Sequence, residues 1–144
     1  MSINKLTQKL IEKGESSKVE LIKDLGSHEQ VARAIAAFLN TKGGTVVVGV
    51  DEKQHVAKDA QPKDVAKLQA FLNKAITPHT LFAVSLDDTD FGRVIVVEVP
   101  KGRDRPFVVE GAVCIRKGAS IKAADAAQLK RMVEEDTDLS LIHI

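Results

Sequence analysis

Residues 37–51 read AFLNTKGGTVVVGVD, and this stretch decides the fold. Its first part ends an alanine-rich helix, and Gly43 and Gly44 stop that helix because glycine accepts the left-handed backbone of a tight return. The residues from Thr45 to Val50 are almost wholly apolar and β-branched, which is typical of a strand buried on both faces. We therefore expect a helix that returns at once into the central strand of a sheet.

The segments before this stretch predict a helix, a strand and the start of a second helix. Apolar residues at helical spacing over residues 3–13 indicate an amphipathic helix that ends at Gly14. Residues 16–23 are rich in Val, Leu and Ile and favour a short strand. Ser27, with Gln30 three residues on, has the pattern of a capping box and predicts where the alanine-rich helix begins.

The second half of the chain continues this alternation after a polar loop over residues 51–60. Periodicity and turn residues predict a helix at 62–75, strands at 81–86 and 94–99 around a turn at 87–92, a hairpin over 107–109 and 112–116, and a helix at 123–135 packed through Ala126, Leu129, Met132 and Val133. The predicted fold class is α/β (α+β), a mixed β-sheet with helices packed on it, in a single domain of residues 1–138.

The last six residues, 139–144, read LSLIHI and follow a finished helix and an acidic run. They show no capping or packing pattern, so we interpret them as a non-native tail and leave them out of the fold prediction. If this interpretation holds, the natural protein can continue beyond Asp138.

Composition limits the kinds of function to consider. The chain has 144 residues, of which 44% are hydrophobic and 28% charged, as expected of one domain with a real core. Its net charge of +1 gives no global basic field, so a nucleic-acid surface must be a local patch. The single Cys114 excludes an intramolecular disulfide, and no apolar run is long enough to span a membrane. We expect a cytoplasmic protein without a membrane partner.

Four motifs together resemble a known family. They are Glu15 and Glu20 five residues apart, the segment from Asn40 to Gly44, the pair Val99-Pro100, and the run Ile115–Ser120. These motifs resemble the Schlafen-type Alba-like domain, a family associated with nucleic acids. The resemblance implies an Alba-like fold, a nucleic-acid partner (DNA or RNA) and a homodimer. The chain departs from the family at residues 113–114, which are Val-Cys where aromatic residues are frequent.

The resemblance also implies a site for a divalent metal. RNA-cleaving members of the family place two glutamates and a later aspartate around such an ion, and the matching residues here are Glu15, Glu20 and Asp51. Oxygen ligands of this kind suit Mg²⁺ or Mn²⁺. Glu52 and Asp59 compete with Asp51 for the third position. The alternative is structural: Glu20 pairs with Lys23 or with Arg116.

The segment from Asn40 to Gly44 allows two interpretations. Its backbone can approach phosphate closely, with Lys42 as a point charge. It can equally be a helix C-cap that leads into a buried strand, with Asn40 bonding the turn. Gly43 and Gly44 follow a helix and precede a strand, the reverse of the order in a nucleotide-binding P-loop, so ATP binding here is not expected.

A group of basic residues completes the candidate site. They are Lys101, Arg103, Arg105, Arg116, Lys117 and Lys122. These residues either share one surface that binds phosphate or are separate solvated charges. Arg116 is the preferred contact because the family signature keeps an arginine there.

The sequence thus favours a nucleic-acid-binding domain that contacts phosphates more than bases, as the N-terminal module of a larger regulator. The predicted contacts are Lys42, Arg103, Arg105, Arg116 and Lys117. Two alternatives stay open. One is a metal-dependent endoribonuclease that uses the three carboxylates, and the other is a protein-interaction or oligomerisation domain.

Overall fold

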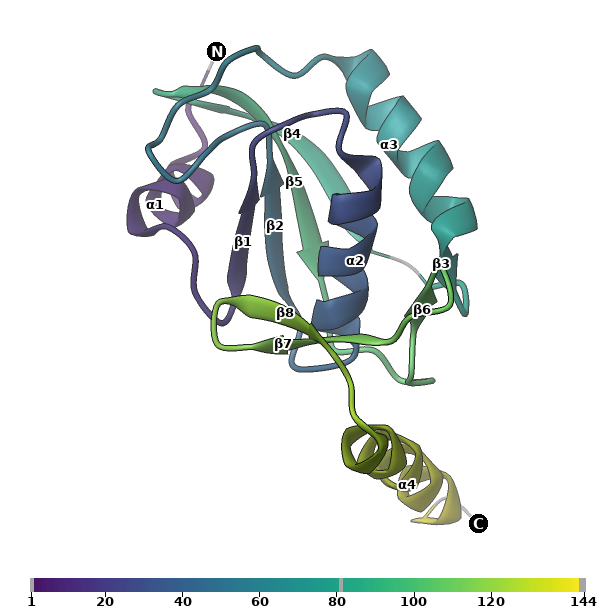
Figure 1. Ribbon diagram of the computed structural model, residues 1–144. Helices are drawn as coiled ribbons and strands as arrows, with labels where there is room; N and C mark the ends of the chain where they lie inside the picture. Colours follow the sequence, from purple (N-terminus) through teal and green to yellow (C-terminus); the bar gives the residue numbers. More distant parts are fainter. Residues whose placement is uncertain (1, 81, 143–144) are drawn as a thin grey trace.

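A computed structural model describes residues 2–80 and 82–142. At its centre lies a four-stranded mixed sheet with the strand order β1-β2-β5-β4 (Figure 1). The strands are β1 (Val19–Ile22), β2 (Gly44–Val48), β4 (Ala83–Thr89) and β5 (Gly92–Val99). β1 and β2 are parallel, and the other two pairs are antiparallel. The predicted mixed sheet is therefore confirmed.

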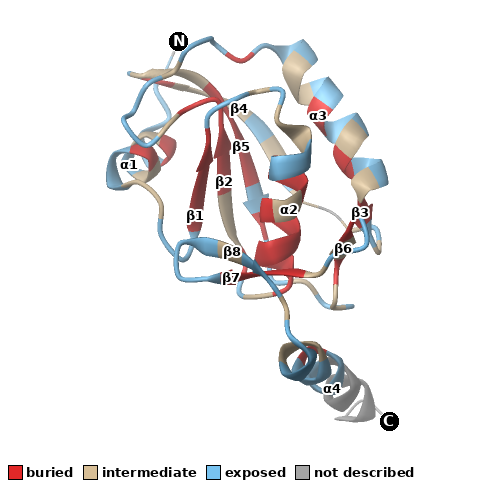
Figure 2. Ribbon diagram, in the orientation of Figure 1, coloured by how far each residue is buried: buried red, intermediate tan, exposed pale blue. Residues whose placement is uncertain are grey.

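Helices lie on both faces of this sheet (Figure 1). α2 (His28–Leu39) and α3 (Pro62–Ala75) cover one face, and α1 (Lys5–Lys13) lies at the other. Successive β2 residues face opposite sides: Val46 and Val48 pack in the cluster under α2, whereas Val47 packs with Ile11 of α1. All three valines are fully buried, as Figure 2 shows for this part of β2. The prediction of a central strand is confirmed.

The glycine turn before β2 has the predicted geometry. Gly43 has a φ of +77°, in the left-handed region that favours glycine. A Cβ added to Gly43 would lie 2.6 Å from the carbonyl oxygen of Val99, and one added to Gly44 would overlap the ring of Phe38. The two glycines therefore allow both the turn and the close packing of β2 against its neighbours.

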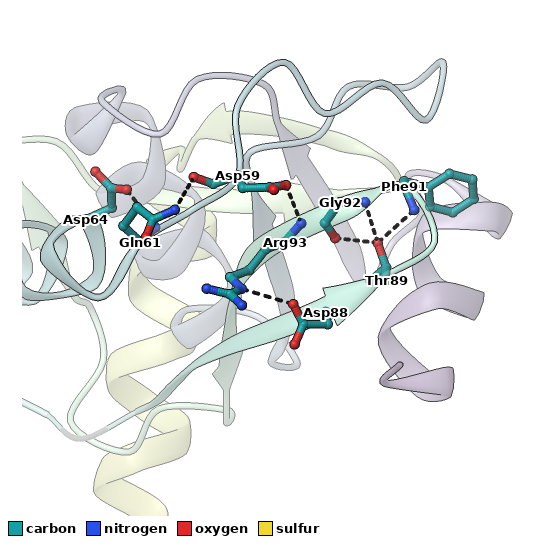
Figure 3. Close-up of polar contacts among 8 residues, drawn as sticks. All are labelled: Asp59, Gln61, Asp64, Asp88, Thr89, Phe91, Gly92 and Arg93. Carbon is teal, nitrogen blue, oxygen red and sulfur yellow. Dashed lines mark hydrogen bonds and ion pairs between the residues drawn. The ribbon is translucent and has the colours of Figure 1, made fainter. Parts of the chain in front are cut away.

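The far end of the sheet differs from the prediction. The expected turn at 87–92 is mostly strand, because β4 runs to Thr89 and β5 starts at Gly92. Figure 3 shows the contacts that close this tight turn: Thr89 Oγ1 donates to the Gly92 carbonyl at 2.7 Å and accepts from the Phe91 amide at 3.2 Å. Local side-chain bonding thus satisfies backbone groups of a turn that is shorter than the one predicted.

The region after β5 corrects a strand-pairing prediction. The expected hairpin over residues 107–116 is reduced to one bridge between Val109 and Ala112. The strands there pair elsewhere: β6 (Val108–Val109) with β3 (Ile76–Thr77), and β7 (Cys114–Lys117) with β8 (Ser120–Ala123). Ala123, the predicted first residue of the last helix, is instead the last residue of β8.

The last helix, α4, spans Ala126–Ile142. Asp125 precedes it as a reciprocal cap, because its backbone amide donates to Gln128 Oε1 and its carboxylate accepts from the Gln128 amide, both at 2.8 Å. Met132 is buried, but Ala126 and Val133 are exposed, so the predicted packing face is only partly right. The helix includes residues 139–142 of the suspected tail, and residues 143–144 lie outside the described part. Whether the tail is native stays a prediction.

The capping box predicted at Ser27 is wrong, because the Ser27 side chain makes no capping hydrogen bond to α2.

None of the helices described within residues 2–80 and 82–142 has the length and apolar character of a membrane span.

Candidate nucleic-acid interface

A hollow of about 380 Å³ lies where four separate segments meet. These segments are the turn after α2, the loop after β5, strand β7 and helix α4. They bring five basic side chains to its lining: Lys42, Lys101, Arg105, Lys117 and Arg131. We call this hollow the basic groove. Three of these five, Lys42, Arg105 and Lys117, were predicted contacts.

Arg116 also borders the groove, but its side chain is directed into the protein. Only 1% of the side chain is exposed. Nη1 donates to Glu20 Oε1 in an ion pair, and Nη2 donates to the carbonyl oxygens of Ser16 at 2.7 Å and Val19 at 2.9 Å. The guanidinium carbon lies 5.0 Å from the centre of the Phe38 ring. The choice of Arg116 as the leading surface contact is therefore corrected, because both of its terminal nitrogens donate to β1 and to the residues just before it.

The Arg116–Glu20 ion pair holds β7, which forms one side of the basic groove, to β1. β1 is an edge strand, and the carbonyl that Arg116 binds at Val19 lies along that open edge. The backbone amide of Arg116 also donates to Thr41 Oγ1 at 3.0 Å, which joins β7 to the turn after α2. Arg116 therefore holds the strand that carries Lys117 against the turn that carries Lys42 without itself reaching solvent.

Asn40 makes a second link between the same segments. It is almost fully buried, and its Nδ2 donates to the carbonyls of Phe107 at 3.0 Å and Cys114 at 2.8 Å. Its Oδ1 accepts from the Phe107 amide at 2.7 Å. The interpretation of this segment as a helix C-cap is thus confirmed, but the Asn40 side chain bonds the backbone of Phe107 and Cys114 instead of the turn. Lys42, two residues on, is exposed at the groove.

α4 places one acidic residue in the basic groove. Glu135 accepts from Arg105 Nη2 at 2.6 Å, and it is the only carboxylate among the described residues that line the groove. Arg105 holds the pKa of Glu135 below its usual range, with help from the charges of Lys101 and Arg131. Arg103 is exposed but does not line the groove.

The three predicted metal ligands are not brought together. Glu15 accepts from the Leu21 amide at 3.2 Å, Glu20 binds Arg116, and Asp51 accepts from the amides of Lys53 and His55 at 2.9 and 3.0 Å. These backbone bonds lower the pKa of Asp51. No group of three His, Cys, Asp or Glu side chains in residues 2–80 and 82–142 is placed to hold a metal ion. The expected convergence is therefore corrected.

The two competing carboxylates are also engaged. Glu52 lies beside Glu15, and a hydrogen bond with Glu15, together with its charge, raises the pKa of Glu52. Asp59 accepts from the Arg93 amide at 2.9 Å, which ties the loop to β5 (Figure 3). Neither therefore supplies the missing ligand next to Glu20.

Comparison with known proteins agrees with this architecture. The model of the family described as "Schlafen, AlbA_2" matches residues 15–125. The chain belongs to this family. No curated protein matches it significantly. A solution NMR structure of the N-terminal domain of a putative ATP-dependent DNA helicase RecG-related protein from Nitrosomonas europaea is 18% identical, with a TM-score of 0.58, and the alignment covers 88% of this chain and 92% of that one.

The crystal structure of the DIP2311 protein from Corynebacterium diphtheriae has the same fold, with 17% identity and a TM-score of 0.65. The alignment covers 81% of this chain but only 23% of that protein, so the Schlafen AlbA_2 chain here spans about a quarter of its length. The family match contains four of the five groove cations. The fifth, Arg131, lies with Glu135 on α4, beyond the matched residues. The sequence prediction missed Arg131 because periodicity predicts a helix but not where it docks.

Proposed function

We propose that this Schlafen AlbA_2 domain binds nucleic acid at the basic groove through the sugar–phosphate backbone. One observation carries the proposal: a chain with a net charge of +1 gathers five basic side chains from four segments around one hollow. Such a local concentration of positive charge attracts a polyanion and releases its condensed counterions. Membership of the Schlafen AlbA_2 family supports a nucleic-acid-related role.

The composition of the groove favours phosphate over base recognition. Its described lining has no aromatic side chain on which a base could stack. Lys42, Lys101 and Lys117 are exposed and carry flexible point charges that suit phosphate oxygens. The domain is therefore proposed to bind many sequences with similar affinity.

The nuclease alternative predicted from the sequence has less support. The nuclease hypothesis needs Glu15, Glu20 and Asp51 at one ion, and each is held by a different partner. The Nitrosomonas structure is an N-terminal domain, and the Corynebacterium protein is about four times as long as the matched part. These relatives support a role as the N-terminal module of a larger regulator. A cytoplasmic homodimer belongs to the same proposal, on the family resemblance alone.

The proposal is tested by fluorescence anisotropy with short labelled single-stranded DNA, RNA and duplex DNA, over a salt series from about 50 to 200 mM. Lys117→Ala removes a groove cation. It should weaken binding to all sequences alike and reduce the slope of log affinity against log salt by about 0.7–0.9.

Lys63→Ala is the matched control, because Lys63 is an exposed lysine in the first turn of α3, at the opposite end of the protein from α4 in Figure 1. It changes the net charge equally and should leave the slope unchanged. Equal effects of the two substitutions, or no salt-dependent binding by the wild type, would refute binding at the groove.

A further inference from the structure

Glu135 stands in an unusual position for an acidic residue. Its carboxylate lies in the basic groove and binds a guanidinium nitrogen of Arg105 at 2.6 Å. Only 6% of the Arg105 side chain is exposed in this arrangement, although 54% of the Glu135 side chain is. A guanidinium of the groove is therefore already bound by a carboxylate, and that carboxylate belongs to a side chain that is more than half exposed.

A carboxylate and a phosphate bind a guanidinium in the same way, through two oxygens that accept from its N–H groups. Three cations surround Glu135, since Lys101 and Arg131 act on it together with Arg105 and keep it ionised. An anionic group of the kind that the groove is proposed to bind is thus already present, supplied by the chain itself.

We propose that Glu135 occupies the phosphate-binding position of Arg105, and that a backbone phosphate replaces its carboxylate when nucleic acid enters the basic groove. This inference rests on the proposed function and adds that Glu135 competes with the nucleic acid for Arg105. Arg105 becomes a phosphate contact only after the exchange, so Glu135 lowers the affinity of the groove.

The attachment of Glu135 permits such an exchange. An ion pair with one partner more than half exposed is worth little in water, so breaking it opposes binding only weakly. Met132 is buried one turn before Glu135 and holds α4 in place while the Glu135 side chain turns away. Arg131, on the same helix, still lines the groove after the exchange.

The test compares Glu135→Gln with Glu134→Gln. Both remove one negative charge from neighbouring positions, but Glu134 does not line the groove and instead lies 4.0 Å from Lys130. Affinity for a labelled single-stranded oligonucleotide at low salt is measured for both. Glu135→Gln should bind about five times more tightly than the wild type, and Glu134→Gln less than about twofold more tightly.

A double-mutant cycle shows whether the gain passes through Arg105. In an Arg105→Gln background, Glu135→Gln should no longer increase the affinity, because the competing ion pair is already absent. Equal gains for Glu134→Gln and Glu135→Gln, or a gain that persists without Arg105, would overturn the exchange while leaving groove binding intact. Absence of binding by every variant would overturn the proposed function and the exchange together.

Amide hydrogen exchange of the wild type gives a measurement that needs no variant. Release of Glu135 should speed exchange in the last part of α4 when the oligonucleotide is added, because the Arg105 contact that ties this turn to the body is lost. Slower exchange at Glu135 and its neighbours on binding would contradict the proposal.

Discussion

Replacement of Arg116 by methionine should destabilise the domain strongly. Replacement of an arginine exposed on a basic surface would, by contrast, have little effect on stability. Methionine keeps an apolar stem against Phe38 but removes all the donors of the guanidinium. The Glu20 carboxylate would then be left nearly buried without its cation, and the Ser16 and Val19 carbonyls would each lose a donor. Removing one partner of a buried pair destabilises a protein by about 3–5 kcal/mol.

The assay is urea unfolding followed by far-ultraviolet circular dichroism, with thermal melting as a check. A loss of about 3–5 kcal/mol corresponds to a fall in Tm of roughly 10 °C for a domain of this size. Arg33→Met is the matched control: Arg33 pairs with Glu110 at 3.9 Å, and their side chains are 43% and 53% exposed. That exposed pair should contribute less than about 1 kcal/mol.

The double variant Glu20→Gln/Arg116→Met separates the ion pair from packing. It removes both charges, so it should be more stable than Arg116→Met alone. If Arg116→Met were no more destabilising than Arg33→Met, the buried ion pair would not hold β7 to β1, and the positioning role assigned to Arg116 would be wrong.

Two further predictions concern the turn before β2 and the loop after it. Gly43→Ala should destabilise the domain by about 1–3 kcal/mol and clearly more than Gly111→Ala, because both glycines have a φ of +77° but only Gly43 has backbone within reach of a new Cβ. Equal urea midpoints for the two variants would contradict the close approach to Val99. Glu52→Gln should stabilise the domain at neutral pH and have less effect in acid: the pKa of Glu52 is raised in the folded state, so the wild type loses stability as the pH rises through that value. A difference in urea midpoint between Glu52→Gln and the wild type that stays constant from pH 4 to 8 would rule out this pairing with Glu15.

The parts of the fold that sequence predicts well are those whose signals are local. Gly43 indicates the turn because its backbone has a positive φ, Gly44 leaves room for the Phe38 ring, and Pro62 marks the start of α3 at the predicted residue. The β7–β8 hairpin was missed although it is local, because Gly118 and Ala119 were not interpreted as the turn between its strands. The pairing of β3 with β6 was missed because it joins Ile76 to Val109, which are far apart in the sequence.

The residues of the candidate site also divide into those that have a local signal in the sequence and those that do not. Lys42 and Lys117 are exposed at the groove, as is expected of lysines near turns, and their contact with nucleic acid stays a prediction. Arg116 was misjudged because a charged residue is expected to be exposed unless it is paired, and the alternative that it pairs with Glu20 is the one that the structure confirms. Arg131 and Glu135 depend on the docking of α4, which no residue pattern specifies.

The most direct test of binding at the basic groove is the map of amide chemical-shift changes when a short oligonucleotide is added to the isotopically labelled protein. Binding at the basic groove should concentrate the changes at the segments around it, residues 40–42, 101–105, 115–117 and 128–135. Changes concentrated instead on the other sheet face, at the hollow lined by Leu10, Phe82 and Pro100, would contradict it.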